Sequence, residues 1–258
     1  MRILDGAYGT LLDHHVAGDE TADDLCVRAP RLVVDAHRAY LEAGATGLRT
    51  NAATAWRRGS TRRRTGLQLA ALDCAREAIA LHAGSQEVEL AGTIGPAGIE
   101  ARDYWRDIEV LLDAEVAVVQ VEHLARVGEL SAALAAWGEV ARGVQGASLL
   151  LGVTLVPARG EAEARALLDA ACDAPEEVRV GLRCCDGPAG LRSHLERLQE
   201  RRDRATWVAP AIGRHVDEPA GWAEALAELV DGLDVAAVGG CCGTTPSFVR
   251  ELGNCVEC

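Results

Sequence analysis

The sequence predicts a single (β/α)8 TIM-type barrel over residues 1–258. Short apolar runs alternate with longer amphipathic stretches eight times along the chain. Such strict alternation is typical of a parallel sheet whose strands are joined by right-handed helical crossovers. Eight of these units in about 250 residues match the size of a closed barrel, whereas the alternative, an open doubly wound sheet, usually has fewer strands. No linker or domain boundary interrupts the pattern.

The eight predicted strands are short and apolar. The run over 148–155 is continuously apolar, as expected for a parallel strand that is buried on both faces. The run over 206–209 is the weakest of the eight. Strands are expected over 2–5, 47–51, 88–93, 116–122, 148–155, 178–184, 206–209 and 235–239.

The predicted helices follow the strands in turn. The stretch over 30–43 places Leu32, Ala36 and Tyr40 on one face, and Gly44 ends it. The third helical piece is brief. Helices are expected over 30–43, 67–83, 103–113, 124–141, 161–172, 189–202, 219–230 and 246–252.

Composition and charge exclude several classes of partner. A net charge of −13 disfavours nucleic acids and anionic membranes. No apolar run approaches the roughly 20 residues that a membrane-spanning helix needs, and an acidic residue, Asp5, comes too early for a signal peptide. We therefore expect a cytoplasmic protein whose nine cysteines are mostly reduced.

Residues able to do chemistry follow the predicted strands. In a closed barrel the active site lies at the carboxyl ends of the strands, and the first and last strands are neighbours. We therefore expect Asp5 to lie near the last cysteine pair. The groups that follow strands one, two, three, four, six and eight are Asp5-Gly6, Thr50-Asn51, Gly95-Pro96, Glu122-His123, Cys184-Cys185 and Cys241-Cys242.

The cysteines at two strand ends predict a metal site. Cys241 and Cys242 lie in a glycine-flanked turn, and Cys184 and Cys185 end another apolar run. Thiolates from two strands can bind one ion, and zinc suits sulfur ligands. Three cysteines would leave the fourth position open, as catalytic zinc sites do. Spacing does not decide between Cys184 and Cys185, and small buried cysteines in the core are the structural alternative.

The chain resembles the homocysteine S-methyltransferase family. The turn over 239–246 is similar to the family's Gly-Gly-Cys-Cys-Gly-Thr-x-Pro motif almost letter for letter, and it is the most specific match. The other matches are weak singly, but they occur in order over nearly the whole chain. They are the segments 4–10, 40–45, 92–96 and 181–184, together with His37, Thr50-Asn51 and Glu122.

This resemblance implies a barrel that binds Zn²⁺ through Cys184, Cys241 and Cys242, with the substrate thiol completing the shell as a thiolate. Asp5 and Glu122 would then face the amino group of homocysteine. The remaining expected substrate-binding residues are Gly6, Thr10 and Asn51, although Asn51 is also a plausible turn residue. His123 replaces the family's threonine.

Two functions follow from these residues. The first is a zinc-dependent methyltransferase that moves a methyl group from a small activated donor to homocysteine, giving methionine. Zinc deprotonates a bound thiol, so the remaining task is to align sulfur and methyl. The second is a diverged zinc- and thiol-binding barrel, which takes another thiol or selenol or works with a corrinoid or folate protein.

Several residues depart from the family pattern or stand outside it. Arg183 replaces the asparagine expected before Cys184, the aromatic and amide residues after strand seven are missing, and the third unit is short. These changes lie around the pocket rather than at the metal, so the resemblance names neither the methyl donor nor the acceptor. The loop from Arg57 to Arg64 is strongly basic and is either a solvated charge run or an anion or partner-protein site. Cys255 and Cys258 form a terminal Cys-x-x-Cys for which we expect no role.

Overall fold

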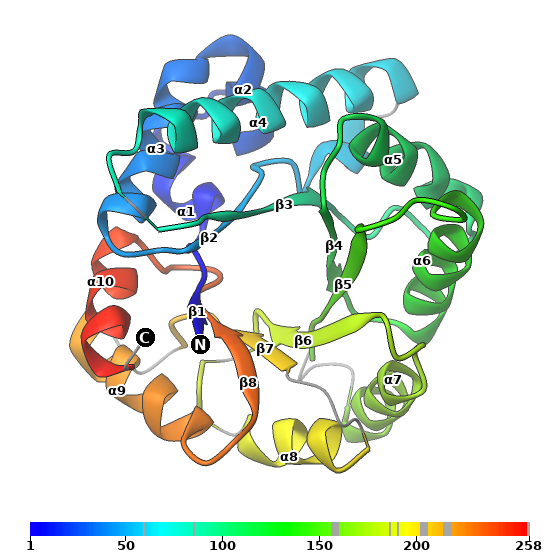
Figure 1. Cartoon of the computed structure of the whole chain (residues 1–258), viewed down its shortest axis with the longest axis vertical. Helices are drawn as coiled ribbons and strands as arrows, with labels where there is room; N and C mark the ends of the chain where they lie inside the picture. Colours follow the sequence, from blue (N-terminus) through cyan, green and yellow to red (C-terminus); the bar gives the residue numbers. More distant parts are fainter. Residues whose placement is uncertain are drawn as a thin grey trace.

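In the computed structural model, eight parallel strands form a ring that is surrounded by helices (Figure 1). The structure describes residues 1–58, 60–84, 86–155, 160–185, 187–189, 191–201, 206–213 and 218–256. The strands are β1 (Arg2–Ile3), β2 (Gly47–Arg49), β3 (Glu89–Ile94), β4 (Val118–Leu124), β5 (Ser148–Val153), β6 (Arg179–Arg183), β7 (Thr206–Ala209) and β8 (Val235–Val238).

The strand order β1-β8-β7-β6-β5-β4-β3-β2 confirms the predicted barrel. Closure between β1 and β2 depends on few contacts. Leu4 and Gly47 form an isolated parallel bridge, and the amide of Asp5 donates to the carbonyl of Gly47 over 3.0 Å. The first and last strands are hydrogen-bonded neighbours, as expected, with Ile3 paired to Val238.

The main helices pack around the ring in the predicted order. Differences lie at their ends: α4 begins six residues earlier than predicted because the Ser60 hydroxyl accepts a hydrogen bond from the amide of Arg63. The helices among the described residues are α1 (Tyr8–Leu12), α2 (Leu25–Arg28), α3 (Pro30–Glu42), α4 (Thr61–Leu81), α5 (Arg102–Asp113), α6 (Val127–Val140), α7 (Glu161–Cys172), α8 (Arg192–Arg201), α9 (Pro219–Val230) and α10 (Pro246–Cys255).

The segment between β1 and α3 is more structured than predicted. It contains α1, α2 and two 3-10 turns, η1 (Asp13–His15) and η2 (Ala22–Asp24), and a third 3-10 turn, η3 (Ala55–Arg58), follows β2. Each of these pieces has three to five residues, which is too short for an apolar period to reveal it.

The core has two parts. The larger cluster lies between the strands and the helices, and a smaller one fills the barrel interior with Trp207 among its members. Gly181 makes room for Trp207, because a Cβ atom there would overlap the indole ring. A Cβ at Gly152 would lie 2.8 Å from Cδ of Arg183 and 3.3 Å from the same indole. The glycine at position 152 therefore leaves room for both the Arg183 side chain and the indole.

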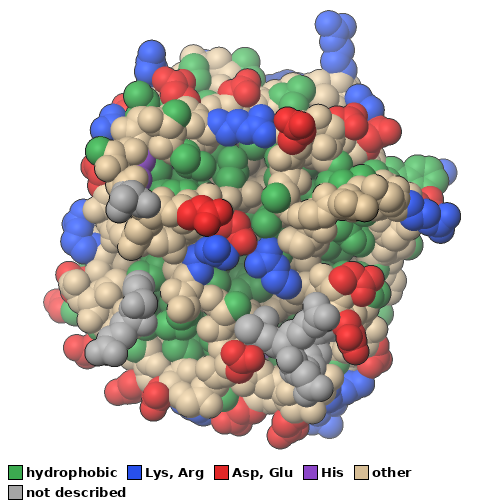
Figure 2. Space-filling model, viewed as in Figure 1, with side chains coloured by type: hydrophobic (Ala, Val, Ile, Leu, Met, Phe, Trp, Pro, Cys, Tyr) green, Lys and Arg blue, Asp and Glu red, His purple; other side chains and the backbone are tan. Residues whose placement is uncertain are grey.

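Charged side chains of both signs lie together over the middle of the ring in the face shown in Figure 2. Ion pairs also join separate strands: Arg2 of β1 and Arg179 of β6 both contact Glu89 of β3, over 2.9 and 3.6 Å. No helix in the described part of the chain is long and apolar enough to cross a membrane.

Candidate functional site

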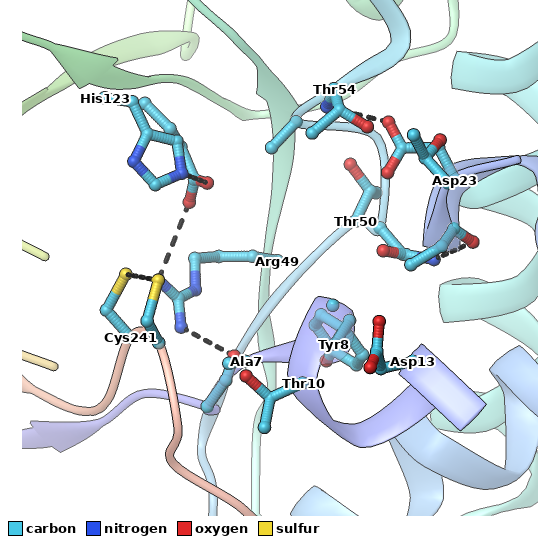
Figure 3. A pocket seen from close by; sticks show the side chains of 18 of the residues that line it. Ala7, Tyr8, Thr10, Asp13, Asp23, Arg49, Thr50, Thr54, His123 and Cys241 are labelled. Carbon is cyan, nitrogen blue, oxygen red and sulfur yellow. Dashed lines mark hydrogen bonds and ion pairs between the residues drawn. The ribbon is translucent and has the colours of Figure 1, made fainter. Parts of the chain in front are cut away.

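The candidate site is a cavity of about 610 Å³ at the carboxyl ends of the strands. The loops after β1, β2 and β8 and the last residues of β2, β4 and β6 contribute to its wall. Cys241 and His123 lie at one end, Asp13 and Asp23 lie at the other, and Arg49 lies between them (Figure 3). The pocket thus has a sulfur end and an acidic end.

Three thiols meet at the sulfur end. The Sγ atoms of Cys184, Cys241 and Cys242 all lie within 4.8 Å of one another, with 3.0 Å between Cys184 and Cys242 and 3.9 Å between Cys241 and Cys242. Cys184 has a left-handed backbone with a φ of 51°. The neighbouring Cys185 is buried, and its thiol donates to the carbonyl of Arg183 over 3.4 Å. The structure therefore brings Cys184, rather than Cys185, to the other two cysteines.

The environment of Cys241 favours its thiolate. Hydrogen bonds from the thiols of Cys184 and Cys242 lower the pKa of Cys241 well below its ordinary value, and the charges of Arg183 and His123 act in the same direction. Nη2 of Arg183 lies 3.2 Å from Sγ of Cys241, within hydrogen-bond distance. Anionic sulfur at this position is what a bound cation needs.

Backbone hydrogen bonds fix the turn that holds the cysteine pair. The amide of Gly240 donates to the carbonyl of Asp5 over 3.1 Å, and the amide of Cys241 donates to the carbonyl of Pro210 over 2.8 Å. A Cβ at Gly240 would overlap the Thr244 side chain, so only glycine fits. The turn is therefore held by β1 on one side and by the segment after β7 on the other.

The structure places Asp5 beneath the pocket rather than in its wall. Asp5 is fully buried, and its carboxylate accepts hydrogen bonds from the hydroxyl of Tyr8 (2.6 Å), the amide of Arg49 (2.7 Å) and Nε of Arg49 (2.5 Å). Both oxygens are occupied. The carboxylate is thus bonded to protein donors in this arrangement, and a contact between Asp5 and a substrate amino group stays a prediction.

Tyr8 extends this buried network to His37. The hydroxyl of Tyr8 donates to Asp5, so it accepts the proton of Nδ1 of His37 over 2.7 Å. Burial lowers the pKa of His37 to about 3, and the ring is therefore neutral at physiological pH. His37 thus supports the site from behind the pocket.

Arg49 lines the pocket but was not predicted from the sequence. Its Nη2 donates to three carbonyl oxygens, those of Asp5 (2.9 Å), Gly6 (3.1 Å) and Gly240 (2.8 Å). This buried guanidinium therefore ties β2 to the end of β1 and to the residue before Cys241. The available signal was a charged residue at the end of an otherwise apolar strand, directly before the Thr50-Asn51 motif.

Glu122 lines the pocket but is also paired with arginines. Its Oε1 contacts Nη1 of Arg183 and lies 3.5 Å from Nη1 of Arg49, and it accepts from Nε2 of Gln120 over 3.2 Å. Its Oε2 lies 3.8 Å from Nε2 of His123. The carboxylate predicted to meet a substrate ammonium is thus held by the protein's own cations.

The other predicted residues line the pocket. A Cβ at Gly6 would lie 2.7 Å from the carbonyl oxygen of Thr244, which explains the glycine. The Thr10 hydroxyl accepts from the amide of Gly243 over 3.0 Å. Nδ2 of Asn51 donates to the carbonyl of Ala22 over 2.8 Å, so this side chain holds the loop before α2.

The acidic end was not predicted. Asp13, Glu20 and Asp23 come from the short turns between β1 and α3, which have no apolar period. Asp23 accepts a hydrogen bond from the amide of Thr54 over 2.7 Å, which connects this segment to the loop after β2. Glu20 is paired with Arg28 over 2.9 Å.

The basic loop makes contacts within the molecule. Arg63 pairs with Asp24 over 3.0 Å, and Arg64 pairs with buried Asp107 over 2.8 Å. The Arg57 guanidinium lies 5.2 Å from the ring centre of Trp56. A partner protein at this loop stays a prediction. At the chain end, Cys255 is exposed, and Cys258 lies outside the described residues.

Comparisons with known proteins agree with this architecture. The family model for Homocysteine S-methyltransferase matches residues 2–256. Methionine synthases of Mycobacterium leprae and Mycobacterium tuberculosis are each 36% identical to this chain over 86 residues, which is 30% of this chain and 7% of each relative. The chain therefore matches only a small part of these long relatives.

Solved structures share the fold. The oxidized form of the Escherichia coli homocysteine methyltransferase MmuM superposes with a TM-score of 0.78 at 20% identity, covering 98% of this chain and 95% of that one. Its metallated form gives a TM-score of 0.76 at 21% identity, covering 98% and 96%. At this identity the likeness concerns the fold.

Proposed function

Because the chain belongs to the homocysteine S-methyltransferase family of methyltransferases, we propose that it transfers a methyl group from a small activated donor to the sulfur of homocysteine, giving methionine. The observation that supports this most is the meeting of Cys184, Cys241 and Cys242 at the sulfur end of the pocket. The three thiols follow the ends of β6 and β8, and Cys241 and Cys242 line a cavity large enough for two small substrates.

The three thiols suit a zinc ion. Tetrahedral zinc with Zn–S bonds of about 2.3 Å needs sulfur atoms roughly 3.8 Å apart. The 3.9 Å between Cys241 and Cys242 matches this value, whereas the 3.0 Å between Cys184 and Cys242 is shorter, so this pair would move apart to hold the ion. When bound, zinc supplies the Lewis acidity that lowers the pKa of a coordinating thiol.

The chain's own residues position the reactants. Arg183 donates to Cys241, and Arg49 and Pro210 hold the turn on either side of it, so the cysteine pair is fixed before any substrate arrives. A sulfur and a methyl carbon must lie about 3–3.5 Å apart and in line for transfer. A rigid sulfur end supports this alignment.

The acidic end suits the donor. Activated methyl groups on sulfonium or quaternary ammonium carry positive charge. Asp13, Glu20 and Asp23 line the pocket, and Figure 3 shows Asp13 and Asp23 on the side opposite Cys241. Acidic groups that line a cleft raise the local concentration of a cation. We therefore propose that the donor enters over this rim and points its methyl group toward the sulfur end.

A methyl-transfer assay tests the proposal. Zinc-loaded protein is incubated with L-homocysteine and either S-methylmethionine or betaine, and methionine is measured. We expect methionine with at least one cationic donor and one zinc per chain, both lost in Cys241→Ala and both kept in Cys255→Ala, which removes an exposed thiol outside the cluster. Zinc-loaded protein that leaves every cationic donor unchanged would refute an autonomous methyltransferase.

The same assay separates the alternative function. A barrel that works only with a corrinoid or folate protein would bind zinc and homocysteine without forming methionine until that partner is added. Turnover by the chain alone excludes this alternative.

A further inference from the structure

The sulfur end of the pocket contains two buried arginines that the family resemblance did not predict there. Arg49 and Arg183 both line the cavity and are only 3% and 4% exposed. Nη2 of Arg183 lies 3.2 Å from Sγ of Cys241. A guanidinium therefore lies within a few atoms of the position that an acceptor sulfur would take at the three thiols.

These cations neutralise the carboxylates beside them. Asp5 and Glu122 contribute two negative charges, and Arg49 and Arg183 contribute two positive ones. Asp5 is fully hydrogen-bonded and does not line the cavity. Oε1 of Glu122 is occupied by Arg183 and Gln120. An ammonium group approaching Oε2 of Glu122 would therefore meet a carboxylate whose charge the arginines already balance.

Donor capacity remains on both arginines. Nε of Arg183 and Nη1 of Arg49 are buried and have no hydrogen-bond partner among the described residues. Nη1 of Arg183 is in close contact with Oε1 of Glu122, and the same oxygen lies 3.5 Å from Nη1 of Arg49, so one carboxylate serves two guanidinium groups. Arginine presents its N–H groups as a planar fork that matches a carboxylate, so buried spare donors favour an anionic ligand group.

We propose that this site recognises its acceptor thiol through an anionic group, a carboxylate bound by Arg183 and Arg49, and that an ammonium group on the acceptor contributes little. Arg183 is thus a specificity-determining residue. The inference rests on the proposed function, since it takes the three thiols as the place where the acceptor sulfur binds. It predicts that a mercaptocarboxylate without an amino group is a good ligand.

Three thiols test this preference, in which the same number of carbon atoms separates the sulfur from each charged group. L-homocysteine has both charged groups, 4-mercaptobutyrate has only the carboxylate, and 3-aminopropanethiol has only the ammonium. Each is titrated calorimetrically into zinc-loaded protein. We expect 4-mercaptobutyrate to bind within about threefold of homocysteine and 3-aminopropanethiol to bind at least about tenfold more weakly, because a hydrogen bond to a charged group is worth about tenfold or more.

Variants assign the effect to Arg183. Arg183→Gln should reduce the preference for 4-mercaptobutyrate over 3-aminopropanethiol by about tenfold or more, and Arg183→Lys should retain part of it. Arg38→Gln is the control, because Arg38 lies half-buried on α3, does not line the pocket and pairs with Glu42. Zinc content measured on each sample separates a lost metal from lost selectivity.

The outcomes are distinct. Equal binding of the two single-charge thiols to the wild-type protein overturns the inference, and this comparison needs no variant to fold. A preference that survives in Arg183→Gln also overturns it. Binding of 4-mercaptobutyrate without binding of homocysteine supports the inference and refutes homocysteine as the acceptor.

Discussion

Replacing Arg49 with methionine tests how the cysteine turn is held. The substitution keeps an unbranched side chain of similar length but removes the guanidinium that bonds Asp5, Gly6 and Gly240. Breaking a fully buried ion pair by removing one partner costs about 3–5 kcal/mol, because the other charge stays buried without compensation. For a chain of this size, this loss lowers Tm by about 6–20 °C.

A second substitution separates charge from hydrogen bonding. Asp5→Asn keeps an oxygen that can accept from Tyr8 and from the amide of Arg49, and it removes the negative charge. In the Arg49→Met background, Asp5→Asn should recover at least about 1 kcal/mol, since the unpaired carboxylate is gone. The three carbonyl oxygens still lack their donor, so recovery stays incomplete.

Urea unfolding in the presence of a chelator measures these free energies without a contribution from metal. Competition with a zinc indicator then measures zinc affinity, which should stay low in both variants because Gly240 has lost its Arg49 donor. Arg31→Met is the control: Arg31 pairs with Glu77 at the surface, where such pairs contribute about 0–1 kcal/mol. A loss below about 1 kcal/mol in Arg49→Met, or additive effects of the two substitutions, would refute this account.

Two further predictions concern the cysteine turn and a buried acid. Gly243→Ala should weaken zinc binding and lower the free energy of unfolding by more than about 1 kcal/mol, because φ is 87° there and a Cβ would lie 2.6 Å from Ile212. Gly143→Ala is the control. Its φ is 82° and the space around it is open, so it measures the loss of stability that comes from the backbone conformation alone. Burial raises the pKa of Asp107 to about 6, although the charge of Arg64 opposes this. The folded state therefore holds this proton more tightly than the unfolded state, so up to about 3 kcal/mol of stability is present below pH 4 and is lost as the pH rises through 6. Unfolding measured from pH 4 to pH 7 should lose this slope in Asp107→Asn, and an unchanged slope would contradict the assignment.

The sequence was sufficient for the barrel and for the place of the site. The alternation of apolar runs and amphipathic stretches extends over the whole chain, so local irregularities do not obscure it. The turn over 239–246 is a specific motif because a side chain at any of its glycines would clash with neighbouring atoms. The structure also distinguishes Cys184 from Cys185, which spacing could not do because the choice depends on one left-handed residue.

The rest of the site depends on contacts between distant segments. Asp5 was expected in the pocket, but whether a carboxylate faces a ligand or an arginine is decided by Arg49, 44 residues further along the chain. The acidic end comes from turns of three to five residues that have no periodic signal. Ion pairs and hydrogen bonds between such distant segments can be identified only from the side-chain positions in a structure.

Residues that lie close together at the site are far apart in the sequence, and this sets the order in which the site can assemble. Gly240 rests on Asp5 and Arg49, and β8 inserts between β7 and β1 before Cys241 can approach Cys184. The ribosome must therefore have synthesised the chain through Cys242 before the three thiols can meet. A chain truncated before Cys241 would keep Cys184 but would lack the other two thiols of the cluster.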